Sequence, residues 1–117
     1  MPSRRVAPRV TPPPPGATPW PDDHEPTPFQ RSVVELVASL RQGDLASYGE
    51  LAAEAGRPRS AQAVANVLRS AMDLPWWRVV PSDGRLYRSH VAVQGPLLEQ
   101  EGHVIDEHRR VRRSRPR

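Results

Sequence analysis

Proline is concentrated at one end of this chain. Ten of the 15 prolines lie in residues 1–28, including the run Pro12–Pro15. Because proline fixes φ and has no N–H to donate, such a segment forms neither helix interiors nor inner strands. We expect a disordered or polyproline II leader at residues 1–26, whose Trp20 either docks on the domain or is exposed. One domain then remains at residues 27–105, large enough to fold without much margin.

The formal net charge of +4 arises at the other end of the chain. Residues 1–28 hold three arginines and three acids, and residues 29–105 hold eight of each. The excess lies in residues 106–117, where six arginines accompany Asp106 and Glu107. We expect this segment to be a disordered tail, which either attracts nucleic-acid phosphates through counterion release or is merely solvated.

The composition excludes several classes of protein. The chain has no cysteine, which excludes disulfides, thiolate metal sites and a cysteine nucleophile. No apolar run approaches the roughly 18 residues of a membrane span. The N-terminus lacks the apolar core of a signal peptide. A soluble cytoplasmic protein is therefore expected, with no cofactor and no metal.

The first predicted helix follows the leader directly. Thr27, Pro28 and Gln30 match a helix cap, a first-turn proline and a capping-box partner. Apolar residues then recur at helical spacing as far as Leu40. Gly43 is expected to end this helix.

Two shorter helices are predicted next. In the stretch SYGELAAEAG, Ser47 and Glu50 form a second capping box and Gly56 is a stop signal. Ser60 is expected to cap a third helix, with an apolar inner stripe and a polar outer face. Two short helices joined by a tight turn form a helix-turn-helix pattern. Many small helical domains share this pattern without binding DNA.

The segment after the third helix predicts a wing. Residues 76–80 (WWRVV) favour a strand, PSDG favours a turn, and RLYRS favours a returning strand. Helical character resumes in VAVQGPLLEQEG and stops at Gly102, with Pro96 in the first turn or at a kink. The predicted fold is mainly α: a winged helix-turn-helix-like domain with a small β-hairpin, flanked by disordered tails.

Four linked motifs carry a resemblance to a known family. SYGELA, GRPRSAQAVANVL, PWWRVVPSDG and LLEQEG follow one another within residues 29–104. Their order and close spacing resemble the DNA-binding domain of the O6-alkylguanine-DNA alkyltransferases. Each motif alone is weak, but the linked set is specific. In that family the third motif reads Pro-Cys-His-Arg, and its cysteine accepts the alkyl group.

Adjacent tryptophans stand at the reactive positions of that third motif. Trp76 occupies the cysteine position and Trp77 the histidine position, whereas Pro75 and Arg78 match. The chain thus looks like the alkyltransferase-like proteins, which bind alkylated guanine without repairing it and flag it for nucleotide excision repair. The chemistry agrees, because an indole offers neither a thiolate nor a usable lone pair for alkyl transfer.

The resemblance implies a pocket for a base flipped out of the duplex. Trp76 is expected to line it, since stacking on an aromatic ring is worth roughly 1–3 kcal/mol and offsets part of the cost of flipping. Trp77, one residue on in an extended stretch, is expected to point away and pack in the core. Tyr48 matches the family's tyrosine beside the flipped nucleotide. Glu101 matches the glutamate that orients the missing histidine, so we expect it to be structural.

Gln62 departs from the family pattern at the start of the recognition helix, which is implied to lie in the minor groove. An arginine there usually fills the space of the flipped base. Glutamine is shorter and neutral, although its amide can still hydrogen-bond to a base edge. No residue is predicted to be catalytic. The residues predicted to bind DNA or the lesion are Tyr48, Ser60, Ala61, Gln62, Ala63, Asn66, Arg69, Trp76 and Arg78.

The sequence leaves three functions open. The first is a monomeric, non-enzymatic, nucleoid-associated sensor of O6-alkylguanine in double-stranded DNA, with nucleotide excision repair proteins as partners. The second is a winged helix-turn-helix regulator or DNA-binding module without lesion specificity. The third is an interaction protein whose DNA face has decayed, with the proline-rich leader and arginine-rich tail as its working parts. Gln62 and the balanced charge of the core keep the third open.

Overall fold

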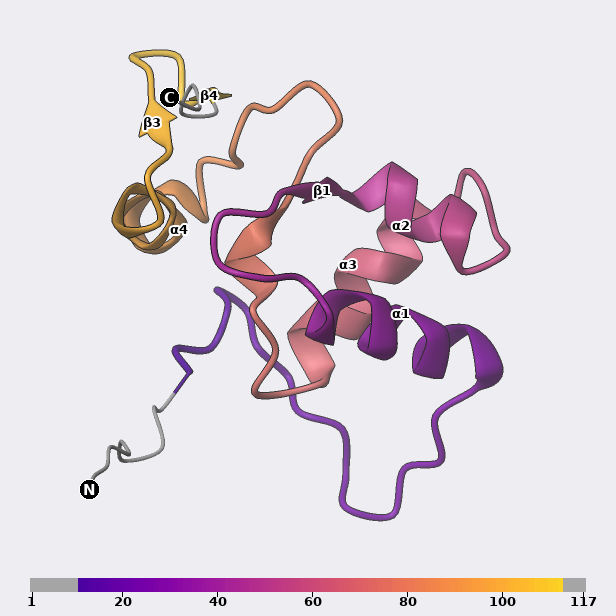
Figure 1. The fold of residues 1–117 in the computed structure, drawn as a ribbon. Helices are drawn as coiled ribbons and strands as arrows, with labels where there is room; N and C mark the ends of the chain where they lie inside the picture. Colours follow the sequence, from indigo (N-terminus) through magenta and orange to yellow (C-terminus); the bar gives the residue numbers. More distant parts are fainter. Residues whose placement is uncertain (1–10, 113–117) are drawn as a thin grey trace, which may run out of the picture.

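The computed structural model describes residues 11–112 of the 117-residue chain. These residues form a mainly helical molecule with two small two-stranded sheets (Figure 1). The elements are α1 (Pro28–Ala38), β1 (Ala46–Ser47), α2 (Tyr48–Glu54), α3 (Ala61–Ser70), the 3₁₀ turn η1 (Trp76–Arg78), β2 (Val79–Val80), α4 (Val91–Gln100), β3 (Val104–Ile105) and β4 (Val111–Arg112). The prediction of a mainly α, winged helix-turn-helix-like fold is confirmed.

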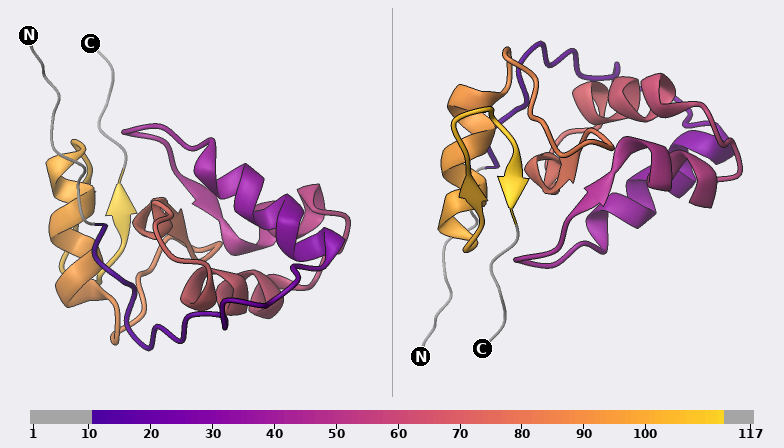
Figure 2. Two further views of the ribbon diagram at one scale, coloured as in Figure 1. Left: turned by 90° about the horizontal axis from the view of Figure 1, so that it is seen from below. Right: turned by 90° about the horizontal axis from the view of Figure 1, so that it is seen from above.

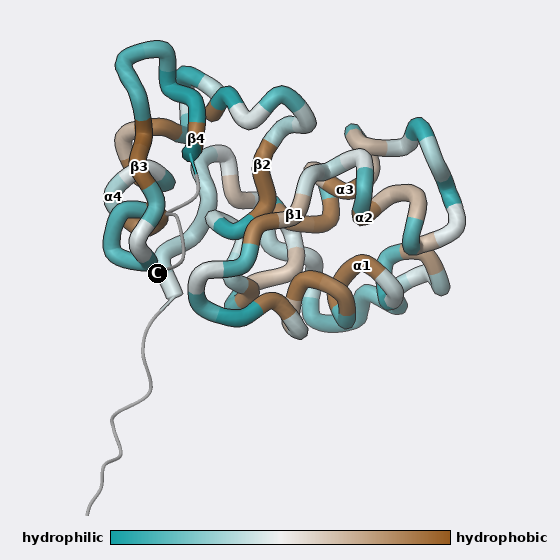
Figure 3. Tube along the Cα trace, turned by 45° about the horizontal axis from the view of Figure 1, so that its top comes forward, coloured by the Kyte–Doolittle hydropathy of each residue, from teal (hydrophilic) through white to brown (hydrophobic). Residues whose placement is uncertain are grey.

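The first three helices pack around the larger of two apolar clusters. Figure 3 shows hydrophobic residues gathered along α1 and at β1 and β2, whereas the turn that joins β3 and β4 is hydrophilic. Spacing of three or four residues places the apolar side chains of each helix on one face. The buried residues of α1 and α3 are Phe29, Val33, Val37, Val64, Val67 and Leu68.

Capping explains where α1 and α2 begin. The Thr27 hydroxyl accepts from the Gln30 N–H, and the Gln30 amide oxygen accepts from the Thr27 N–H. Ser47 and Glu50 repeat this reciprocal pair at α2, so both predicted capping boxes are confirmed. Ser60 precedes α3 without a side-chain capping bond. Its ψ of 40° departs from the extended backbone that brings a hydroxyl over the first turn.

The predicted stop at Gly56 is confirmed, but the stop at Gly43 was wrong. Gly56 has a φ of +94° and closes α2. In contrast, α1 already ends at Ala38, and Leu40 packs on the core from a non-helical segment. Gly43 serves a later turn, with a φ of +93° and an N–H that donates to Glu101 at 2.9 Å.

The predicted pairing of residues 76–80 with RLYRS was wrong. The two tryptophans lie in the turn η1, and β2 pairs in parallel with β1, Val79 opposite Ala46. Both residues of β2 are buried, so their backbone groups need partners inside the protein. The Gln94 side chain supplies one of these partners, donating to the carbonyls of Trp77 and Val79 at 3.0 Å.

The small hairpin lies later in the chain, where β3 and β4 pair antiparallel. Figure 2 shows this hairpin beside α4. A second apolar cluster, with Leu86 and Leu98 fully enclosed, packs beneath it. As predicted, α4 ends just before a turn at Gly102. Pro96 lies inside the helix and not in its first turn.

Within residues 11–112, no helix is long and apolar enough to cross a membrane.

The C-terminal segment differs from the expected disordered tail over residues 106–112. The Asp106 carboxylate accepts from the backbone N–H groups of His108 and Arg110 and thereby holds the turn before β4. An aspartate that binds nearby backbone donors favours such turns. The rest of the predicted tail, residues 113–117, lies outside the described residues.

Over residues 11–26 the proline-rich segment lies along the domain, and of the two alternatives for Trp20 the docked one is found. The segment passes from the side of α4, beside α3, to the start of α1 (Figures 1 and 2). The N–H groups of Thr18 and Trp20 donate to the carbonyls of Arg69 and Ser70 at 2.8 and 3.1 Å. A helix end leaves such carbonyls without partners, and the Trp20 ring packs on the core. Residues 1–10 lie outside the described residues.

Candidate nucleic-acid interface and base pocket

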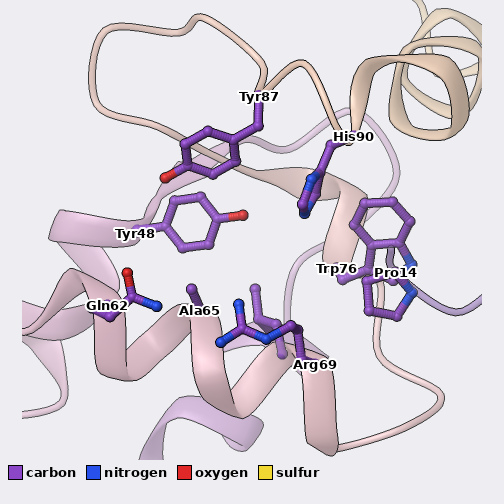
Figure 4. Close-up of a pocket in the computed structure, with 9 residues that line it drawn as sticks. Pro14, Tyr48, Gln62, Ala65, Arg69, Trp76, Tyr87 and His90 are labelled. Atoms are coloured by element: carbon purple, nitrogen blue, oxygen red, sulfur yellow. The ribbon is translucent and has the colours of Figure 1, made fainter. Parts of the chain in front are cut away.

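A pocket of about 220 Å³ lies between α2, α3, η1 and the segment that leads into α4. Figure 4 shows Tyr48 and Gln62 at one end, Trp76 with Pro14 at the other, and Tyr87 and His90 across from Arg69. The lining residues are Pro14, Tyr48, Gln62, Ala65, Leu68, Arg69, Trp76, Tyr87 and His90. The fold thus brings four members of the predicted binding set to one cavity: Tyr48, Gln62, Arg69 and Trp76.

Trp76 forms part of the inner wall of this pocket. Only 3% of the residue is exposed, so most of the ring is covered and only a small part of its surface faces the cavity. Its indole N–H donates to the Pro12 carbonyl at 2.7 Å. The rings of Trp77 and His90 meet it edge to face, with centroids 6.2 and 5.9 Å away. These contacts fix the ring's orientation before any ligand arrives.

Trp77 and Arg78 lie away from the pocket. Trp77 is partly buried against both apolar clusters, and its indole N–H donates to Glu101 at 2.9 Å. Arg78 pairs with the same carboxylate at 2.7 Å and also donates to the Leu40 carbonyl. Its side chain is 15% exposed. Arg78 was predicted to bind DNA, but in the structure its guanidinium binds groups within the protein. Glu101 holds these side chains in place, which is the structural role that was expected of it.

Tyr48 stands in the first turn of α2 with 6% of its surface exposed. Its ring lies 6.0 Å from that of Tyr87. Burial raises the pKa of the Tyr48 phenol above its ordinary value of 10.0, Tyr87 adds to the rise, and Arg69 opposes it. The phenol is therefore neutral at physiological pH and keeps a proton to donate. The Ser47 capping box holds the start of its helix in place.

Polar side chains continue along the exposed face of α3. The Gln62 amide donates to the Asn66 side chain at 3.2 Å, and the Arg69 guanidinium donates to the same oxygen. This row runs from the pocket rim along the helix. Ala61 and Ala63 pack partly against the core instead, and Ser60 is half-buried at the helix start.

Sequence reasoning missed several lining residues, above all Pro14, Tyr87 and His90. Tyr87 is 46% exposed, and its ring lies 5.4 Å from that of His90. Burial lowers the pKa of His90 below its ordinary value of 6.5, and Arg69 lowers it further. His90 therefore presents a neutral imidazole at pH 7. The signal for Tyr87 and His90 in the sequence was the pair of aromatic rings in YRSH, shortly after the turn PSDG.

The chemistry of the pocket suits a flat, hydrogen-bonding ring. Aromatic and apolar groups supply stacking and contact surface, while Tyr48, Gln62 and Arg69 supply polar groups at fixed positions. The whole sequence has no cysteine to accept an alkyl group. Within residues 11–112, no cluster of three or more His, Asp or Glu side chains is arranged to hold a metal ion.

Comparison with known proteins identifies relatives of this domain. Residues 28–103 match the family model of the 6-O-methylguanine DNA methyltransferase DNA-binding domain. A methylated-DNA–protein-cysteine methyltransferase of Methanothermobacter thermautotrophicus is 38% identical over 79 residues, 65% of this chain and 45% of its own. The DNA base-flipping protein of Escherichia coli is 34% identical over 80 residues, 66% of this chain and 58% of its own. The chain spans about half the length of these relatives.

Solved structures of S. pombe proteins bound to DNA have the same fold. S. pombe ATL in complex with DNA matches at a TM-score of 0.62 and 25% identity, over 72% of this chain and 86% of that chain. S. pombe Atl1 in complex with damaged DNA containing O6-carboxymethylguanine matches at 0.61 and 24% identity, over 74% and 88%. Residues 11–26 precede the part of this chain that the family model covers.

Proposed function

Because this chain belongs to the 6-O-methylguanine DNA methyltransferase family through its DNA-binding domain, we propose that it is a DNA-binding sensor of O6-alkylguanine. The alkylated base is flipped out of the duplex and held in the pocket of Trp76. The protein does not alter the alkylated base chemically. Its complex with the damaged DNA is what nucleotide excision repair proteins recognise. The sensor acts as a monomer in the cytoplasm, on the nucleoid.

The observation that carries this proposal is one cavity lined by Tyr48, Gln62 and Trp76. These side chains come from the start of α2, the start of α3 and η1, so only the folded chain collects them. A flipped base needs a pocket that gives aromatic contact and reads its edge. A relative at 34% identity is a DNA base-flipping protein, which supports the same mode of binding here.

The proposed sensor has no transferase activity. Alkyl transfer from the O6 atom of guanine needs a nucleophile that can be deprotonated, with a base beside it. Trp76 and Trp77 stand where the resemblance places those two groups, and an indole supplies neither. Incubation with DNA that carries a labelled O6-methyl group should leave the label on the DNA. Label recovered on the protein would refute this part of the proposal.

Four polar side chains in and beside the pocket have roles in the proposed complex. Gln62, exposed at the start of α3, enters the space that the flipped base leaves and hydrogen-bonds to the orphaned cytosine. The Tyr48 phenol donates to the phosphate beside the flipped nucleotide. Arg69 and Asn66 contact the backbone. Flipping costs a few kcal/mol and costs least for a damaged, poorly paired base, so the pocket selects damaged sites.

The first experiment is fluorescence anisotropy with matched duplexes that carry guanine or O6-methylguanine at one position. We expect the full chain to bind the lesion duplex at least tenfold more tightly. Trp76→Ala should remove most of this preference, because stacking on an aromatic ring is worth roughly 1–3 kcal/mol. Tyr48→Phe should weaken lesion binding while the ring contact remains.

A matched control is Val104→Ala, since Val104 is exposed on the hairpin at 57% and lies outside the pocket lining. It should bind both duplexes as the unchanged chain does. Equal affinity of the unchanged chain for both duplexes would refute the sensor. Tight binding to one undamaged sequence would instead establish a regulator.

A further inference from the structure

The segment of residues 11–20, here called the strap, is fixed to the domain at both ends. Two backbone hydrogen bonds, from Thr18 and Trp20, join it to the end of α3. Gly16 turns the chain with a φ of +74°, and a side-chain carbon there would lie 3.5 Å from Arg69. The far end is fixed through Pro12, which accepts the hydrogen bond of Trp76. The strap therefore crosses the pocket in a defined position.

The strap orients the main aromatic ring of the pocket. The bond from the Trp76 indole to the Pro12 carbonyl is 2.7 Å long. A buried indole N–H without an acceptor costs about 1–3 kcal/mol, so this carbonyl favours one ring position. The strap is thus part of the structure that presents Trp76 to a ligand.

Pro14 contributes its own side chain to the cavity. It is buried and lines the pocket, whereas its neighbour Pro13 is exposed. Figure 4 shows the Pro14 ring beside the Trp76 indole. The cavity of about 220 Å³ is present while the strap is seated. Pro14 is therefore a wall of the pocket and does not fill it.

The two ends of the pocket differ in chemistry. The end formed by Tyr48 and Gln62 carries a hydroxyl and an amide, which suit the polar edge and backbone of a nucleotide. The end formed by Trp76 and Pro14 is more apolar, because its indole N–H is already bonded and the polar group beside it is the neutral imidazole of His90, which meets the Trp76 ring edge to face. An alkyl group gains free energy where it removes apolar surface from water, so the adduct belongs at the second end.

We propose that Pro14 is a specificity-determining residue, the wall that limits the size of the O6-alkyl group that the pocket accepts. This inference rests on the proposed function. We expect a methyl group to fit against the Pro14 ring with the strap seated, and a benzyl group to collide with it. The partner is therefore O6-alkylguanine with a small substituent, and the N-terminal segment sets that limit.

The experiment compares full-length Pro14→Ala with full-length Pro13→Ala on duplexes that carry guanine, O6-methylguanine or O6-benzylguanine. In the unchanged chain, the methyl adduct should bind more tightly than the benzyl adduct. Pro14→Ala removes two ring carbons and should weaken methyl binding about fourfold to fifteenfold, at ~0.8 kcal/mol for each methylene that loses its contact. Benzyl binding should strengthen, so the ratio of the two dissociation constants shifts at least tenfold. Pro13→Ala should leave this ratio unchanged.

A second variant and an NMR spectrum distinguish the loss of the Pro14 ring from a loss of the strap's structure. Pro14→Val keeps apolar bulk at the position and should restore much of the preference for methyl. The indole N–H signal of Trp76 in the proton NMR spectrum should persist in each variant, which reports that Pro12 still accepts its bond. If Pro14→Ala shifts the ratio of the two dissociation constants and Pro14→Val does not restore it, the proposal that Pro14 limits the size of the alkyl group is wrong.

The remaining outcomes are also decisive. Lesion preference in the unchanged chain with equal ratios for Pro14→Ala and Pro13→Ala overturns this inference and leaves the sensor standing. Tighter binding of Pro14→Ala to all three duplexes, guanine included, overturns it too, because Pro14 then acts as a plug. No lesion preference in the unchanged chain refutes the sensor, and the inference falls with it.

Discussion

The Glu101 carboxylate joins three separate parts of the chain. It accepts from the Gly43 N–H, from the Trp77 indole and from the Arg78 guanidinium. Burial raises the pKa of this carboxyl, but the three donors outweigh burial and hold the pKa below its ordinary value of 4.5. The folded state therefore binds this proton less tightly than the unfolded chain. The carboxylate's contribution to stability is complete above pH 4.5 and is lost as the pH falls through the folded-state pKa.

Glu101→Gln should lower the free energy of unfolding by about 1–3 kcal/mol at pH 7, because charge-assisted bonds are lost and one donor is left unpaired. Urea unfolding followed by circular dichroism measures this difference. As the pH falls below 4.5, the difference between the two proteins should shrink. The matched control is Glu99→Gln, at an exposed position near the end of α4, two residues before Glu101. A loss as large in Glu99→Gln would contradict a specific role for Glu101.

At the scale of single elements, two serines test what capping contributes. Ser47 and Ser60 each precede a helix, but only Ser47 makes a side-chain capping bond. Ser47→Ala should lower the free energy of unfolding by about 1 kcal/mol. Ser60→Ala should change it by less than about 0.5 kcal/mol, as a substitution away from such features usually does. Thermal and urea unfolding measure both, and equal losses would refute the assignment.

The starts of α1 and α2 could be predicted from the sequence, whereas the end of α1 could not. The capping boxes of α1 and α2 were readable because their partners lie three residues apart. The end of α1 was not readable, because Leu40 keeps the apolar period yet meets the core from a non-helical segment. Periodicity reports which side chains are buried, and it does not report whether the backbone between them is still helical.

At the scale of the whole molecule, Trp20 tests whether the N-terminal segment is part of the domain. Its ring packs on the core and stacks on His24, with centroids 4.4 Å apart. Trp20→Ala should lower the free energy of unfolding by about 1–3 kcal/mol, through the loss of buried apolar area. Pro21→Ala, at the exposed neighbour, is the control. A change below about 0.5 kcal/mol for Trp20→Ala would mean that the segment does not dock.

The sequence by itself determined the local and the chemical properties of this protein. Two capping boxes, the stop at Gly56 and apolar spacing located the first three helices, although the end of α1 was misplaced. These signals act within a few residues of backbone. The absence of cysteine, with Trp76 in the third motif, excluded a thiol acceptor on composition alone. The resemblance carried by the linked motifs led to Tyr48, Gln62 and Trp76, which the fold then collected in one pocket.

Only the tertiary structure decided which distant segments complete that pocket. Pro14, Tyr87 and His90 reach it because the strap crosses α3 and because η1 turns the chain before β2. Composition suggested a disordered or polyproline II leader and left open whether Trp20 docks, since prolines cannot join a sheet or a helix interior. Yet a proline-rich segment can still donate its few N–H groups to a helix end and bury one tryptophan. Such docking depends on the surface that it meets, and that surface forms only when the helices pack.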